Sequence, residues 1–151
     1  MMKPVTGKVK PVPERYHSVT PYLVVQGVPK LIDFVKQTFN ATEIERVTRP
    51  DGTISHAELK IGDSIVMMGE ANEQSKPMPT MLYVYVEDVE AAYRRALQAG
   101  AKTVRELKDE FYGDLAGGVS DSFGNQWWIA THKEDVSPEE LRRRMQAQNR
   151  S

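Results

Sequence analysis

The chain has 151 residues, with 20 Lys and Arg against 21 Asp and Glu, and it has no cysteine. This length suits one domain that buries its own core, and the near-neutral charge favours neither nucleic acid nor an anionic membrane as a partner. The lack of cysteine excludes disulfides, thiolate catalysis and zinc fingers. No apolar run is long enough to cross a membrane, and the N-terminus lacks the apolar segment of a signal peptide, so we expect a cytoplasmic protein.

The first 16 residues contain Pro4, Pro11 and Pro13, interleaved with lysines. Proline removes a backbone donor and fixes φ, so this stretch is neither a helix nor an inner strand. We expect an extended arm over residues 1–16. Either a free tail or an arm docked on a partner subunit fits this pattern.

Two segments of the chain look alike, residues 17–71 and residues 80–132, and a Pro-containing linker over 72–79 joins them. In each segment a short strand leads into a one-faced helix, and three strand-like runs follow. Asp88 is the expected N-cap of the second helix, and Gly100 is expected to end it. The apolar faces of the two helices consist of Val28, Leu31, Ile32, Val35 and Phe39, and of Val89, Ala92, Tyr93 and Ala96.

The strand-like runs are separated by turn signals, of which "RPDGT" is the strongest. A tail follows over residues 133–151, where Ser137, Pro138 and Glu140 mark the start of a short charged helix. This terminal helix is either solvated or a partner-binding element. The six runs are "TEIERVTR", "ISHAELKIG" and "SIVMMGE" in the first segment, and "KTVRELKD", "LAGGVSD" and "NQWWIATH" in the second.

Several local motifs, in their order and spacing, resemble the vicinal oxygen chelate superfamily, and in particular its PhnB-like branch. They are "YHSVTPYLVV", "HAELKIGDSIVMM", "DVEAAYRRALQAGA", "YGDLAGGVSDSFGNQWWIATH" and "EDVSPEELRRR". The superfamily includes glyoxalase I, extradiol dioxygenases and bleomycin-resistance proteins. The resemblance implies an α+β fold, in which two tandem βαβββ modules form curved, mostly antiparallel sheets around a cleft. It also implies a homodimer, and the cleft forms either within one chain or across the dimer.

The metal-dependent members of this family hold their metal with four side chains on the first and last strands of each module. Carried over one at a time, those positions fall on Thr20, Met67, Met81 and Trp128, with Met68 as the alternative in the first module. None of these is a usual ligand of a hard or borderline divalent ion. We therefore predict no metal and no other cofactor.

The pair Trp127–Trp128 lies in a predicted strand, so the two side chains point to opposite faces of the sheet. We expect Trp127 under the helices and Trp128 in the cleft, and the reverse register would exchange them. Every second residue of the neighbouring strands would face the same cleft and line it with aromatic and methionine side chains. Such a lining is usual for a small-molecule site. The predicted ligand-binding residues are Tyr22, His56, Glu58, Met67, Tyr83, Tyr85, Tyr112 and Trp128.

His56 and Glu58 are the candidates for chemistry, because side chains two apart on a strand leave from the same face. A carboxylate can orient an imidazole as a base, but the pair equally fits a ligand contact or a solvated surface. Tyr112 and Asp114, in a Gly-rich loop, either close over a ligand or belong to a hairpin. His132, at a strand end, is expected to cap or pack at a junction.

These features favour a metal-independent protein that binds a planar or amphipathic organic molecule in an aromatic cleft, as bleomycin-resistance relatives do. The alternative is a metal-dependent lyase, isomerase or dioxygenase with a displaced metal site near His56 and Glu58. A structural dimer with a vestigial cleft is the third reading. One fold hosts all three.

Overall fold

The computed structural model describes residues 8–149, and within them lie two four-stranded sheets and three helices. The repeat predicted from the sequence is confirmed, because each sheet belongs to one βαβββ module. In chain order the elements are β1 (Tyr22–Val25), α1 (Val28–Phe39), β2 (Thr42–Thr48), β3 (Ile54–Ile61), β4 (Ser64–Glu70), β5 (Met81–Tyr85), α2 (Val89–Gln98), β6 (Lys102–Asp109), β7 (Asp114–Ser120), β8 (Gln126–His132) and α3 (Pro138–Asn149).

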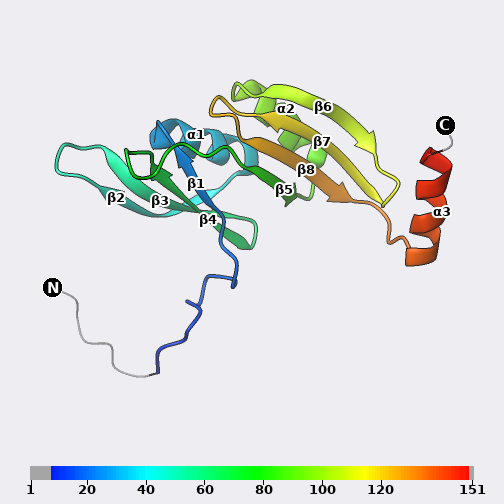
Figure 1. Ribbon diagram of the computed structural model, residues 1–151, viewed down its shortest axis with the longest axis horizontal. Helices are drawn as coiled ribbons and strands as arrows, with labels where there is room; N and C mark the ends of the chain where they lie inside the picture. The colour runs from blue at the N-terminus through cyan, green and yellow to red at the C-terminus, as the bar shows by residue number, and fades with distance from the viewer. Residues whose placement is uncertain (1–7, 150–151) are drawn as a thin grey trace.

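The two sheets have the same internal order, β1-β4-β3-β2 and β5-β8-β7-β6. In each, the first strand pairs in parallel with the last strand of its module, and the other pairs are antiparallel. The modules lie side by side along the long axis of the molecule, with α1 and α2 in contact behind the sheets (Figure 1). Each sheet thus has one face packed on a helix and one face that no helix covers. This is the α+β architecture expected from the sequence.

The two module helices begin in different ways. Asp88 caps α2 as predicted, accepting the Ala91 N–H at 3.1 Å. The N-cap of α1 is Gly27, which has no side chain to offer, with φ at +116°. Glu70, at the end of β4, supplies the missing acceptor and takes the N–H groups of Gly27 at 2.9 Å and Val28 at 3.1 Å. A carboxylate also complements the positive end of the helix.

Trp127 is buried under the helices, as the strand alternation predicted, and it packs between the two modules. Its side chain is fully buried, and its ring centroid lies 6.0 Å from that of Phe34 and 5.4 Å from that of Phe39, both on α1. The indole N–H donates to Asp121 Oδ2 at 2.9 Å. A second link between modules runs from Arg95 on α2, whose Nε donates to the carbonyl of Thr38 near the end of α1 at 3.0 Å.

The turn "DSFGN" between β7 and β8 is organised around the same carboxylate. Besides Trp127, Asp121 accepts the backbone N–H groups of Phe123 and Asn125, each at 2.9 Å, and the Asn125 side-chain amide at 3.0 Å. The Asn125 Oδ1 in turn accepts the N–H of Thr80 at 3.0 Å. The turn therefore fixes both the start of β8 and the entry of the chain into β5.

Both ends of the described chain project from the body (Figure 1). Residues 8–21 contain neither helix nor strand, and the part of the predicted arm over 1–7 lies outside the described residues, as do 150–151. Helix α3 has no buried residue, and Arg144 ties it back by donating to the carbonyl of Phe111 at 3.0 Å. Among residues 8–149 no helix is both long and apolar enough to span a membrane.

Replacing Trp127 by Ala should lower the free energy of unfolding by about 3–5 kcal/mol, as for other large-to-small truncations in a core. Urea unfolding followed by circular dichroism measures this loss. The matched control is Trp128→Ala, which removes the same side chain from the uncovered face of the same strand. Equal losses in the two variants would contradict the placement of Trp127 between the modules.

Candidate functional site

The predicted ligand-binding residues gather on two different faces. We call the face of the first sheet opposite α1 the first face, and the face of the second sheet opposite α2 the second face. The first face carries Tyr22, His56, Glu58 and Met67, and the second carries Tyr83, Tyr85 and Trp128, with Tyr112 in the adjoining turn. Among residues 8–149 no hydrogen bond or ring contact joins one group to the other. The sequence left open whether the cleft forms within one chain or across a dimer, and in this chain the predicted residues lie on two separate faces.

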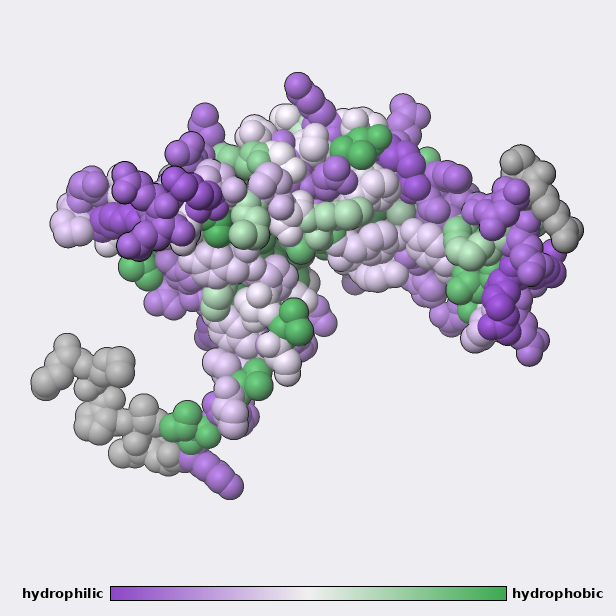
Figure 2. All heavy atoms as spheres, in the orientation of Figure 1, coloured by the Kyte–Doolittle hydropathy of each residue, from purple (hydrophilic) through white to green (hydrophobic). Residues whose placement is uncertain are grey.

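Hydrophilic residues concentrate at the two ends of the molecule, and the surface between them is paler and partly apolar (Figure 2). The underside of the second module is hollowed between the first module and α3 (Figure 2). Several large side chains of the two faces are exposed, including Tyr22 at 51%, Met81 at 61% and Tyr85 at 60%. Exposed apolar surface of this kind is typical of a binding site or an interface.

On the first face, Tyr22, His56 and Glu58 form a short chain of hydrogen bonds. The Tyr22 hydroxyl lies 3.3 Å from His56 Nδ1, and His56 Nε2 lies 3.1 Å from Glu58 Oε2. The two ring nitrogens of His56 are therefore both engaged, Nδ1 by the Tyr22 hydroxyl and Nε2 by the buried side chain of Glu58. The absence of a side chain at Gly69 makes this possible, because a Cβ there would lie 3.0 Å from Tyr22 Cε1.

On the second face, three side chains converge on the buried carboxylate of Asp114. The hydroxyls of Tyr83 and Tyr85 each donate to Oδ2 at 2.8 Å, and His132 Nδ1 lies 2.7 Å from Oδ1. The Tyr112 hydroxyl lies 3.1 Å from that of Tyr83. The side chain of Asp114 is only 1% exposed, so these donors replace the water that an ionised carboxylate would otherwise need.

The electrostatics of this cluster favour an ionised Asp114. Burial raises its pKa, but hydrogen bonds from His132, Tyr85 and Tyr83 outweigh burial and leave the pKa below its usual value. The bond to Asp114, and a second one to Asp135 at 2.8 Å, raise the pKa of His132. The pKa of Tyr83 is raised, mainly by burial, and that of Tyr85 by its hydrogen bond to Asp114, so both hydroxyls stay protonated.

Trp128 lies on the second face, as predicted, but its surroundings are more polar than expected. Its indole packs over Gly118, where a Cβ would lie 2.8 Å from Cε2, and its N–H donates to Gln126 Oε1 at 3.1 Å. The guanidinium carbon of Arg105 lies 4.8 Å from the ring centroid, a cation–π distance. Arg105 also pairs with Glu110, whose side chain is 7% exposed.

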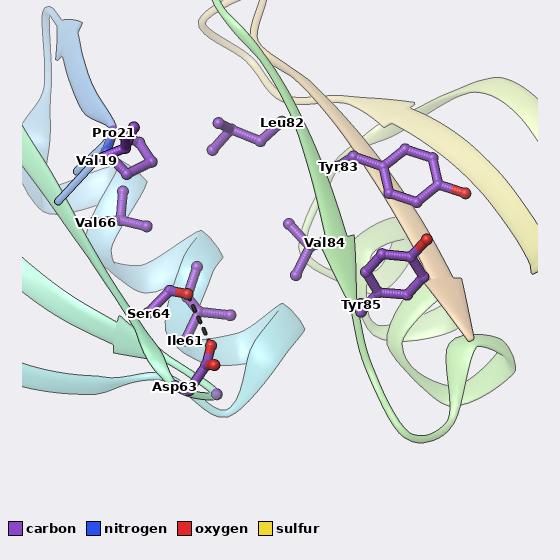
Figure 3. A pocket seen from close by; sticks show the side chains of 11 residues that line it. Val19, Pro21, Ile61, Asp63, Ser64, Val66, Leu82, Tyr83, Val84 and Tyr85 are labelled. Carbon is purple, nitrogen blue, oxygen red and sulfur yellow. Dashed lines mark hydrogen bonds between the residues drawn. The ribbon is translucent and has the colours of Figure 1, made fainter. Parts of the chain in front are cut away.

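A groove of about 520 Å³ runs between the two modules, a volume within the range of small-molecule sites. Figure 3 shows Leu82 and Val84 of β5 pointing into this groove, while the rings of Tyr83 and Tyr85 point away from it. The opposite wall is formed by Ile61, Val66 and Pro21, with Val19, Asp63 and Ser64 at its rim. Strand β5 therefore separates an apolar groove from the aromatic second face.

The residues at the four family metal positions are not usual ligands of a divalent ion. Met81 is 61% exposed, Trp128 offers only an indole N–H that is already donated to Gln126, and Thr20 and Met67 line a small cavity with residues of the arm. These are not the donors of a divalent ion. Within the described part of the chain, no group of three or more His, Cys, Asp or Glu residues could hold one.

Three residues of the second face were not among the predicted ligand-binding set: Asp114, Arg105 and His132. Asp114 was taken as a loop residue, although it is the first residue of β7 and pairs directly with His132 on β8. The signal was the hairpin register itself, since counting back from Gly118 opposite Trp128 brings Asp114 opposite His132. His132 was expected at a junction, and it does join β8 to the segment leading to α3 through Asp135.

Comparison with known proteins shows the family to which this chain belongs. The sequence model of the Glyoxalase/Bleomycin resistance protein/Dioxygenase superfamily matches residues 15–129, and the chain belongs to that superfamily. The protein Mb0911c of Mycobacterium bovis is 35% identical over 142 residues, which are 87% of this chain and 93% of that protein. The resemblance inferred from the sequence motifs is confirmed.

Solved structures show the same architecture. TioX from Micromonospora sp. ML1 superposes with a TM-score of 0.66 at 27% identity, covering 75% of this chain and 96% of TioX. The PhnB protein from Bacillus cereus has a TM-score of 0.62 at 16% identity, covering 76% of this chain and 99% of PhnB. At that identity the likeness to PhnB concerns the fold alone.

The pKa of His132 should lie above the usual value of about 6.5 for histidine, and Asp114→Asn should lower it. Protonated His132 stabilises the fold below the unfolded-state pKa, so this contribution should disappear as the pH rises through the folded-state pKa. NMR titration of the histidine ring protons measures the pKa, with His132→Gln identifying the signal. A pKa at or below the usual value would contradict the hydrogen bonds to Asp114 and Asp135.

Proposed function

We propose that this protein binds and sequesters a planar or amphipathic organic molecule on its aromatic faces, without a metal ion. The observation that carries the proposal is the second face, where Tyr83, Tyr85 and Trp128 project from neighbouring strands. Tyr83 and Tyr85 meet edge to face, with centroids 5.3 Å apart. Exposed aromatic rings held in place by hydrogen bonds bind flat ligands by stacking, at little cost in side-chain entropy.

The residue types at the family metal positions support a role without metal chemistry. A threonine, two methionines and a tryptophan are side chains suited to contact apolar and aromatic ligands rather than to ligate a metal ion. His56 and Glu58, the candidates for a displaced metal site, are hydrogen-bonded to each other, and His56 is also hydrogen-bonded to Tyr22. We assign this trio a role in ligand contact on the first face.

We also propose that the protein acts as a homodimer, in which the first face of one chain lies opposite the second face of its partner. Two observations support this arrangement. Each face in one chain is only half of an enclosure, and both faces expose large apolar side chains, including Tyr22, Met81 and Tyr85. A second copy would cover these side chains and enclose a ligand between two aromatic walls.

A thermal-shift screen of flat organic molecules should find compounds that raise the melting temperature, because a ligand bound only to the folded state stabilises it. Trp128→Ala should weaken the binding of such a compound by about tenfold or more, through loss of stacking area. The control is Leu97→Ala, which removes a partly exposed side chain from α2, away from both faces.

The screen is paired with elemental analysis of the purified protein, before and after incubation with nickel, manganese, iron and zinc salts and desalting. Retention of one ion per chain would contradict the metal-independent proposal. If the His56→Ala variant no longer retained the ion, a metal-dependent lyase, isomerase or dioxygenase would be favoured instead.

Sedimentation equilibrium should give twice the mass of the chain, 17.1 kDa by sequence. Deleting residues 1–15 should weaken the dimer if the arm docks on a partner subunit, since such an arm adds contact area to the interface. An unchanged dissociation constant would identify the arm as a tail, and a monomer in the full-length protein would contradict the dimer.

A further inference from the structure

The hydrogen bonds donated to Asp114 on the second face determine which ligand charge this face favours. Asp114 carries no proton, so each of its bonds requires a donor from its neighbour. Tyr83 and Tyr85 each possess one hydroxyl proton, and both protons point inward to Asp114 Oδ2. The outward side of these hydroxyls is therefore the oxygen lone pairs, which can only accept hydrogen bonds.

Tyr112 continues the chain of hydrogen bonds in the same direction, toward Asp114. Because Tyr83 has already given its proton to Asp114, the contact between the two hydroxyls has Tyr112 as donor and Tyr83 as acceptor. The oxygen of Tyr112 is then left as an acceptor as well. The oxygen of Tyr83 is thus already occupied, and those of Tyr85 and Tyr112 are left to accept hydrogen bonds from whatever binds there.

The cations in contact with this cluster are already paired. Arg105 lies over Trp128 and forms an ion pair with Glu110. His132 lies between Asp114 and Asp135, at 2.7 and 2.8 Å. With both cations matched by carboxylates, neither is free to receive an anionic ligand, and the charge of Asp135 adds to the negative potential at this end of the sheet.

We propose that the second face binds an organic cation, a flat or amphipathic molecule whose protonated amine or amidinium meets the oxygens of Tyr85 and Tyr112. The half-exposed tyrosine rings add cation–π attraction to these hydrogen bonds. A neutral molecule of the same shape lacks the charge-assisted hydrogen bonds. An anion has no proton to donate and is repelled by the partial negative charge of the phenol oxygens. This assignment rests on the proposed ligand-binding function and narrows it to a ligand class.

The test uses three ring systems of matched shape, 9-aminoacridine as the cation, acridine as the neutral compound and 9-anthracenecarboxylate as the anion, titrated calorimetrically at neutral pH and physiological salt. The wild-type protein should bind 9-aminoacridine about tenfold or more tightly than acridine, the size of effect expected of a charge-assisted hydrogen bond. It should bind 9-anthracenecarboxylate more weakly than either.

The double variant Tyr83→Phe/Tyr85→Phe keeps both rings, removes the Tyr85 acceptor and removes the Tyr83 oxygen that receives the Tyr112 proton. The preference for 9-aminoacridine over acridine should therefore fall toward one. The single variant Tyr85→Phe changes an exposed ring and replaces the double variant if that one does not fold. It should lower the preference for 9-aminoacridine over acridine in part. The matched control is Tyr93→Phe, which makes the same change on α2, away from both faces, and should leave the preference unchanged.

Equal binding of acridine and 9-aminoacridine, or tighter binding of 9-anthracenecarboxylate, would overturn the cation assignment and leave the ligand-binding function standing. An undiminished preference in the tyrosine variants would overturn it too, because the selectivity would then come from elsewhere. Failure of all three probes to bind would also overturn it, and the ligand-binding function would fall only if the wider thermal-shift screen found no stabilising compound.

Discussion

The packing of Trp127 against α1 is the contact on which the arrangement of the two modules depends. The indole comes from the last strand of the second module, yet its ring partners, Phe34 and Phe39, belong to the helix of the first. Its N–H is held by Asp121, and Asp121 also organises the turn that precedes the strand. One carboxylate therefore sets the local turn, the register of β8 and the interface between modules. Because the helices meet behind the sheets, both uncovered faces are left available for binding.

Much of this arrangement could be predicted from the sequence. Helix spacing and strand alternation are local properties, and they correctly placed Val28, Leu31 and Ile32 in the core and separated Trp127 from Trp128. The Asp88 cap followed from residue type and position. The role of Glu70 could not be read in the same way, because it caps a helix that begins more than 40 residues earlier in the chain, at Gly27 and Val28.

The candidate site was predictable residue by residue but not as a set. Period-two alternation correctly put His56 beside Glu58 and grouped Tyr83 with Tyr85, since each pair shares a strand. The convergence of the tyrosines on Asp114 depends on side chains that cross from β5 over β8 to β7, a distance that alternation along one strand does not describe. The division into two faces follows from how the modules pack, which is set by Trp127 and by Arg95.

The opposite environments of the two tryptophans give the molecule two built-in optical reporters. The indole of Trp127 is shielded from water and bonded to a carboxylate, so its fluorescence reports on the packing between the modules. That of Trp128 lies beneath a guanidinium on an uncovered face, where a dissolved quencher or a bound aromatic molecule can reach its neighbourhood. Two variants that each keep a single tryptophan would therefore report separately on unfolding and on occupancy of the second face, without any added label.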